Sequence, residues 1–172
     1  MNVRITVALG LIVLAAVSRL LPHPPDFAPL AAMALFGGAY FRDRRLAFAV
    51  PLATLLLTDL VLGLHETMPF VYLGFAMTVL IGFGLRSRVR LVSVAGAAMA
   101  SSVLFFVVTN FGVWQVSNLY SHDAAGLLAC YVAAIPFFQN SLLGDFLYSG
   151  LLFGGMALAE RYSPAVRGSA VD

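Results

Sequence analysis

The longest apolar run of this chain, 124–159, extends for 36 residues and is interrupted at Pro136 and at Gln139-Asn140. A transmembrane helix needs about 20 predominantly apolar residues. Only 10% of the residues are charged, whereas a soluble domain carries about 25%. The sequence therefore predicts an all-α integral membrane protein that forms one domain over 1–172, with the lipid bilayer as its main solvent. Five further spans are expected at 5–21, 28–41, 46–63, 68–85 and 91–109.

The arginines indicate how the last apolar run is divided. All ten basic residues are arginines, and they cluster at the ends of the apolar runs. Basic loops stay on the cytoplasmic side, and nine of the ten arginines lie inside only if a single crossing follows residue 123. We therefore expect a span at 138–159 and a short helix at 124–135 on the outer face. Six spans then cross the inner (cytoplasmic) membrane with both termini in the cytoplasm. A cleaved signal peptide is the alternative interpretation of the run at 5–21.

A proline-rich connector, residues 18–29 (SRLLPHPPDFAP), joins the first two apolar runs. Its four prolines exclude a continuous helix and favour extended backbone. The same twelve residues hold Arg19, His23 and Asp26 in an otherwise apolar chain. This pattern favours a polar mouth at the membrane boundary, with these three side chains as candidate substrate-binding groups.

Asp145 lies about two turns below the outer end of the last expected span. An ionisable side chain at membrane depth costs at least about 2.5 kcal/mol, so it is usually paired or faces a polar cavity. Asp145 is therefore either a substrate or ion site, or half of a structural ion pair for which Arg19 is the candidate partner. Asp59, near the end of its own span, has the same two interpretations.

Aromatic and amide side chains supply further candidate substrate-binding residues. The segment 110–123, expected to be an outer loop, holds Asn110, Trp114 and Tyr120. Asn140 and Tyr148 lie in the last apolar run. Aromatic rings can stack on a planar ligand, but they are also enriched at membrane interfaces as anchors.

The metal-ligating residue types form no recognisable metal motif. Cys130 is the only cysteine, and it is interpreted either as a small packing residue or as a soft ligand to a metal-bearing cofactor. His23, His65 and His122 suit a divalent metal chemically, but they lack the i, i+4 spacing of a helical site. The alternative is that these histidines face water, and no resident metal or cofactor is assigned.

Small residues at a spacing of four mark two helix faces, at Ala34 and Gly38 and at Ala97 and Ser101. Such faces let helices approach closely. They indicate either packing within the molecule or docking of a partner protein.

Several function classes find no support in the sequence. The net charge of +2 does not indicate nucleic-acid binding, because the arginines follow the membrane topology. Neither a G-x-S-x-G motif nor a Walker A motif is present, and no enzymatic activity is expected.

Three motifs resemble a family of small bacterial membrane proteins described as transport proteins. They are SRLLPHPPDFAPLAAMALFGGAYF, TNFGVW at 109–114, and GLLACYVAAIPFFQNSLLGDFLYSGLLFG at 126–154. That family is similar to the substrate-binding S components of energy-coupling-factor (ECF) vitamin transporters. The resemblance implies six helices, a pocket for a vitamin or trace metal near the outer face, and docking onto a transmembrane scaffold with ATPases.

The expected function is therefore uptake of a vitamin-like, corrinoid or trace-metal micronutrient. The resemblance includes solitary S components linked to cobalamin, which makes Cys130 a candidate cobalt ligand. Two alternatives stay open: an ion- or proton-coupled permease in which Asp145 and Asp59 titrate, and a structural membrane subunit without a ligand.

Overall fold

The computed structural model describes residues 3–168, and all the regular elements in that part of the chain are helices. Six longer helices are followed by one short helix. They are α1 (Val3–Ser18), α2 (Leu30–Tyr40), α3 (Arg44–Leu62), α4 (Met68–Phe83), α5 (Leu91–Val116), α6 (Ala124–Tyr162) and α7 (Pro164–Gly168).

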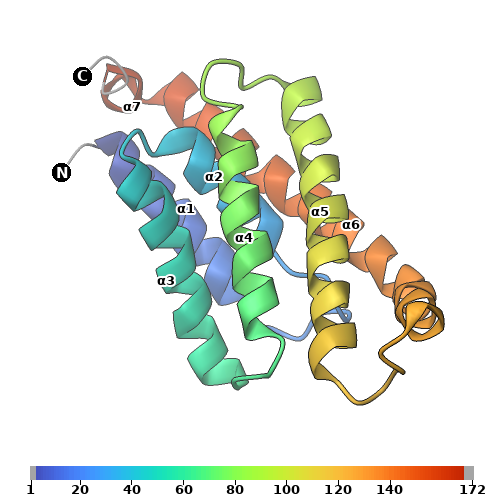
Figure 1. Ribbon diagram of the computed structural model, residues 1–172. Coiled ribbons are helices and arrows are strands. Elements are labelled where there is room, and N and C mark those ends of the chain that lie inside the picture. Colours follow the sequence, from blue (N-terminus) through green and yellow to red (C-terminus); the bar gives the residue numbers. More distant parts are fainter. Residues whose placement is uncertain (1–2, 169–172) are drawn as a thin grey trace.

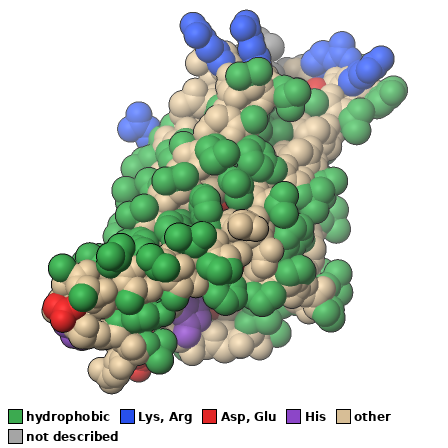
Figure 2. Space-filling model, turned by 90° about the vertical axis from the view of Figure 1, so that its right-hand side faces the viewer, with side chains coloured by type: hydrophobic (Ala, Val, Ile, Leu, Met, Phe, Trp, Pro, Cys, Tyr) green, Lys and Arg blue, Asp and Glu red, His purple; other side chains and the backbone are tan. Residues whose placement is uncertain are grey.

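Helices α1 to α6 run alternately between two ends of the molecule (Figure 1). The start of α1, the end of α6 and the loops 41–43 and 84–90 lie at one end, which we call the arginine end. The connector and the α3–α4 and α5–α6 loops lie at the other, the connector end. Figure 2 shows arginines gathered at the first end, acidic and histidine side chains mainly at the second, and apolar side chains between them.

Three helices, α3, α5 and α6, are long and apolar enough to cross a membrane. Large apolar side chains such as Leu57 and Val61 on α3 and Leu143 on α6 are exposed. A surface of this kind is stable in lipid rather than in water. The protein is therefore a helical membrane protein, as the composition predicts.

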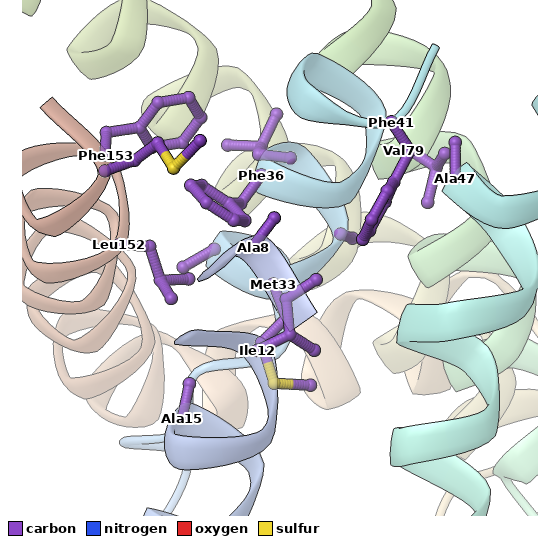
Figure 3. Close-up of a cluster of buried hydrophobic side chains, with 14 of the residues drawn as sticks. Ala8, Ile12, Ala15, Met33, Phe36, Phe41, Ala47, Val79, Leu152 and Phe153 are labelled. Carbon is purple, nitrogen blue, oxygen red and sulfur yellow. The ribbon is translucent and has the colours of Figure 1, made fainter. Parts of the chain in front are cut away.

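The core is centred on α2, a helix of only 11 residues. Residues 31–38 are all buried, because α2 packs against α1, α3, α4, α5 and α6. A helix that is apolar on every side belongs in such an interior position. Figure 3 shows Met33 and Phe36 of α2 among side chains of neighbouring helices, and the Phe36 ring meets the edge of Phe153 at 5.3 Å between centroids.

Glycines bring α2 and α4 into backbone contact. A Cβ atom on Gly38 would overlap the carbonyl oxygen of Val79, and a Cβ on Gly82 would lie 2.5 Å from the carbonyl oxygen of Leu35. Ala34, next along this face of α2, is fully buried. The close spacing of small residues thus packs helices of the same chain together.

The burial of Ala34 and Gly38 inside the molecule supports the packing interpretation of this face rather than the docking interpretation. Ser101 on α5 is likewise buried, so it presents no surface to a partner. Ala97 is half-buried against the core, and its docking role stays a prediction.

Helix α6 differs from the expectation at one point. The separate helix at 124–135 and span at 138–159 form one continuous helix of 39 residues that contains Pro136. A proline removes one backbone hydrogen bond but does not always end a helix. At 1.5 Å per residue, α6 is about 58 Å long, well beyond a hydrocarbon core of about 30 Å. Helix α5 also continues to Val116, so residues 110–116 are helical and the predicted loop at 110–123 is shorter.

Candidate functional site

A cavity of about 330 Å³ lies at the connector end, bounded mainly by the connector, α5 and α6. Small-molecule sites typically have volumes of about 300–1,000 Å³. Its polar lining is Arg19, Asp26, His65, Thr67, Ser102, Thr109, Asn110, Ser141 and Asp145. Its apolar lining is Leu30, Val71, Phe105, Phe106, Val113, Ala134, Phe137 and Phe138. A second cavity of about 70 Å³ is also lined by Asp26, Ser141 and Asp145.

Asp145 on α6 is the most deeply buried charged group of this lining, with 5% of its surface exposed. The Ser102 hydroxyl donates a 2.6 Å hydrogen bond to its Oδ2 atom. The backbone N–H of Ala31, in the first turn of α2, also interacts with the carboxylate. The residue that precedes α2, Pro29, provides no side-chain cap. Asp145 therefore stabilises the start of α2 from another helix, because a helix N-terminus attracts negative charge.

The alternative interpretation, an ion pair between Arg19 and Asp145, is wrong, because Arg19 is bonded elsewhere. Its Nη1 atom lies 2.5 Å from Asp59 Oδ1 and 2.7 Å from Thr58 Oγ1 on α3. The Tyr72 hydroxyl on α4 donates to Asp59 Oδ2 at 3.0 Å. This Arg19–Asp59 cluster joins the end of α1 to α3 and α4. Asp59 thus has the structural role that one interpretation of the sequence gave it.

Asp145 has no cation beside it. Within residues 3–168, neither Asp145 nor Asp26 has an Arg, Lys or His nitrogen within 4 Å. Of the two interpretations of Asp145, the structural ion pair is therefore not supported, because the carboxylate is hydrogen-bonded but forms no salt bridge. A buried carboxylate of this kind that lines a cavity is a candidate site residue.

The aromatic wall of the cavity consists of Phe105 and Phe106 on α5 and Phe137 and Phe138 on α6. The rings of Phe106 and Phe138 pack at 4.9 Å between centroids, so the wall is continuous across the two helices. Sequence reasoning missed these residues. The available signal was the spacing of Ser102, Phe105 and Thr109, which recurs every three or four residues along α5.

The connector is held against α6 by specific contacts. The Asn140 side chain donates a 3.1 Å hydrogen bond to the Pro25 carbonyl oxygen. Gly144 lets the connector approach, since a Cβ there would lie 3.3 Å from the backbone nitrogen of Ala28. Asp26 adopts a left-handed backbone conformation, with φ of 59°. Desolvation raises the pKa of its carboxyl above the usual 3.8.

Four of the ten predicted substrate-binding residues line the cavity: Arg19, Asp26, Asn110 and Asp145. The prediction is not supported by geometry for the other six, which have no place in the lining: His23, Trp114, Tyr120, Cys130, Asn140 and Tyr148.

The contacts of these residues explain why they lie elsewhere. The Trp114 indole N–H donates to the Ser121 carbonyl oxygen at 2.9 Å and so fastens the α5–α6 loop. The Cys130 thiol is buried against the Asn110 carbonyl oxygen at 3.5 Å, as expected of a packing cysteine. The Tyr148 hydroxyl accepts a 3.0 Å hydrogen bond from Ser18, which ties α6 to α1.

The histidines do not assemble into a metal centre. Nowhere between residues 3 and 168 do three or more His, Cys, Asp or Glu side chains form a group that could hold a metal ion. His65 lines the cavity and bonds to Thr67, His122 packs edge-on against Trp114, and His23 bonds to backbone oxygens of its own connector. The weak metal hypothesis therefore has no geometry to support it.

The chain belongs to DUF6580, a family of unknown function, whose sequence pattern matches residues 1–166. The match includes every helix that contributes to the cavity. No curated protein and no solved structure matches the chain. The chemistry of the site therefore has to be argued from its own residues.

Proposed function

We propose that this protein takes up a small, vitamin-sized micronutrient across the cytoplasmic membrane, in the manner of an ECF S component. The observation that supports this is the cavity of about 330 Å³, which combines convergent polar groups with an aromatic wall. Ligand sites of transport and binding proteins commonly have this make-up.

The proposed topology has six spans with both termini in the cytoplasm. The alternation of α1 to α6 between the two ends supports it (Figure 1). Because basic loops favour the cytoplasm, the arginine end would lie inside and the cavity would face outward. Helices α1 and α4, with 16 residues each, reach about 24 Å and would need flanking residues or local thinning of the bilayer.

The size of the cavity narrows the proposed substrate. A corrinoid is much larger than a space of about 330 Å³, and Cys130 does not line that space. We therefore favour a micronutrient of one or two rings over a corrinoid. Since the chain has no ATP-binding motif, a separate scaffold with ATPases is the proposed energy source.

Native mass spectrometry of the gently purified protein tests the proposal. We expect the wild type to retain a small molecule. The variant Ala134→Phe, which fills the cavity, should lose it. Ala133→Phe, one residue along α6 on the exposed surface, is the matched control and should keep it. Retention in both variants would place the ligand outside the cavity and contradict the proposal.

An ion- or proton-coupled permease is the second candidate function. The buried Asp145 carboxylate without a cation partner favours it, because such groups relay protons or ions in transporters. Uptake by whole cells separates the two candidates. Loss of uptake on adding an uncoupler while ATP is maintained would support the permease, whereas uptake that follows ATP would support the S-component-like function.

A further inference from the structure

The balance of charge in the cavity indicates what kind of molecule it can hold. Four titratable side chains line it: Arg19, Asp26, His65 and Asp145. Arg19 is bonded to the buried carboxylate of Asp59, so this pair is close to neutral. The carboxylates of Asp26 and Asp145 have no such partner in the described part of the chain.

Two other groups offset this negative charge only in part. The N-terminus of α2 faces Asp145 and supplies at most about half of a positive charge. His65 lies at the α3–α4 loop, and its Nδ1 atom bonds to the Thr67 hydroxyl. The cavity lining therefore holds two acidic side chains, Asp26 and Asp145, that have no basic ion-pair partner in the described part of the chain.

The aromatic wall favours the same type of ligand. Phenylalanine faces attract cations within about 6 Å of the ring centroid, and they also pack against flat apolar groups. Phe105, Phe106 and Phe138 line the same cavity as Asp145 and Ser141. A ligand with a positive nitrogen and an apolar body would satisfy both parts of the lining.

We infer that the cavity selects an organic cation, with a protonated or permanently charged nitrogen attached to an aromatic or apolar body. This inference rests on the proposed function and specifies its substrate class. Asp145 and Asp26 are the groups that favour the positive charge. An anion of the same size would meet two acidic side chains that lack a basic partner, and it should bind poorly.

Three probes with one indole ring test the inference: tryptamine, tryptophol and indole-3-propionate. At pH 7 they end in an ammonium, a hydroxyl and a carboxylate respectively, because primary amines have pKa values near 10. A thiol-reactive dye follows thermal unfolding through Cys130, the only cysteine, which is 2% exposed. We expect tryptamine to bind at least about tenfold more tightly than tryptophol. Indole-3-propionate should bind most weakly.

Variants identify which carboxylate produces the preference for tryptamine. Asp145→Asn should abolish the preference for tryptamine, and Asn keeps an acceptor for Ser102. If Asp145→Asn does not fold, Asp26→Asn on the connector should still weaken tryptamine binding several-fold. Asp43→Asn is the control, because Asp43 is exposed, caps α3 at the arginine end and is replaced by another good capping residue.

Two results would overturn the inference. Equal binding of the three probes, or tighter binding of the carboxylate, would show that the cavity does not select cations, although the proposed uptake function would stand. Failure of every probe to raise the melting temperature at millimolar concentration would also overturn it. The proposed function would then be tested separately, by comparing ligand retention in the wild type, Ala133→Phe and Ala134→Phe.

Discussion

Two buried carboxylates near the connector end have opposite surroundings. Asp59 contacts an arginine, a threonine hydroxyl bonded to the same arginine, and a tyrosine hydroxyl. Asp145 receives a serine hydroxyl and the start of a helix, but no basic side chain lies within 4 Å of it in residues 3–168. Burial alone therefore does not distinguish a structural carboxylate from a site residue. The arginine partner marks Asp59 as structural, and the lack of one makes Asp145 a candidate site residue.

The largest expected effect is that of Asp59→Ala. This change leaves the Arg19 guanidinium buried beside α3 without its partner, which costs about 3–5 kcal/mol when a buried ion pair is broken on one side. Asp145→Ala removes a hydrogen-bond acceptor but exposes no opposite charge, so it should cost only about 1–3 kcal/mol. Reversible unfolding in detergent measures both values.

The double variant Arg19→Met/Asp59→Leu is the control for this comparison. It removes both charges and should be more stable than Asp59→Ala, because no unpaired ion remains. Equal stability of the double and single variants would show that Arg19 reaches water or lipid headgroups once released. The distinction drawn between the two carboxylates would then fail.

Tyr72→Phe should have an intermediate effect. It removes the 3.0 Å hydrogen bond to Asp59 Oδ2 and should lower the free energy of unfolding by about 1 kcal/mol. In an Asp59→Ala background the same change should have little further effect, since the acceptor is already missing. Tyr131→Phe, which loses a 2.7 Å hydrogen bond to the Val107 carbonyl oxygen, is the matched control and should remain additive with Asp59→Ala.

The smallest expected effect concerns Asp26 and pH. Desolvation raises the pKa of this carboxyl above 3.8, so its ionisation weakens the folded state as pH rises through the raised value. Asp26→Asn should therefore increase stability slightly at pH 7, and the gain should vanish below pH 3.8. Asn also tolerates the φ of 59° at this position. A melting temperature that falls at pH 7 would contradict this sign.

The helices were largely predictable, because apolar runs bounded by arginine or proline determine where membrane helices begin and end. The predicted 46–63 and 68–85 correspond to α3 (Arg44–Leu62) and α4 (Met68–Phe83). Helix α6 was harder to predict. Counting arginines required one crossing after residue 123, and the prediction divided the apolar run to meet that requirement, whereas in the structure the run is one continuous helix.

Mainly the charged residues of the candidate site could be predicted from the sequence. Arg19, Asp26 and Asp145 stand out in an apolar chain, and all three line the cavity. The four phenylalanines do not stand out, because a ring that faces a cavity and a ring that faces lipid have the same sequence context. The sequence also could not identify the partner of Arg19, since Asp59 lies 40 positions away and Asp145 was an equally suitable candidate.

The short, enclosed helix α2 has a consequence for how the protein is made. Its 11 residues cover about 16 Å, roughly half of the hydrocarbon thickness. In the proposed six-span arrangement, α2 cannot be inserted by the translocon as an independent segment. It has to enter as one arm of a hairpin with α1 or α3, and its glycine contact with α4 forms only when that later helix has been synthesised. Until then, the face of α2 that carries Gly38 lacks its partner on α4.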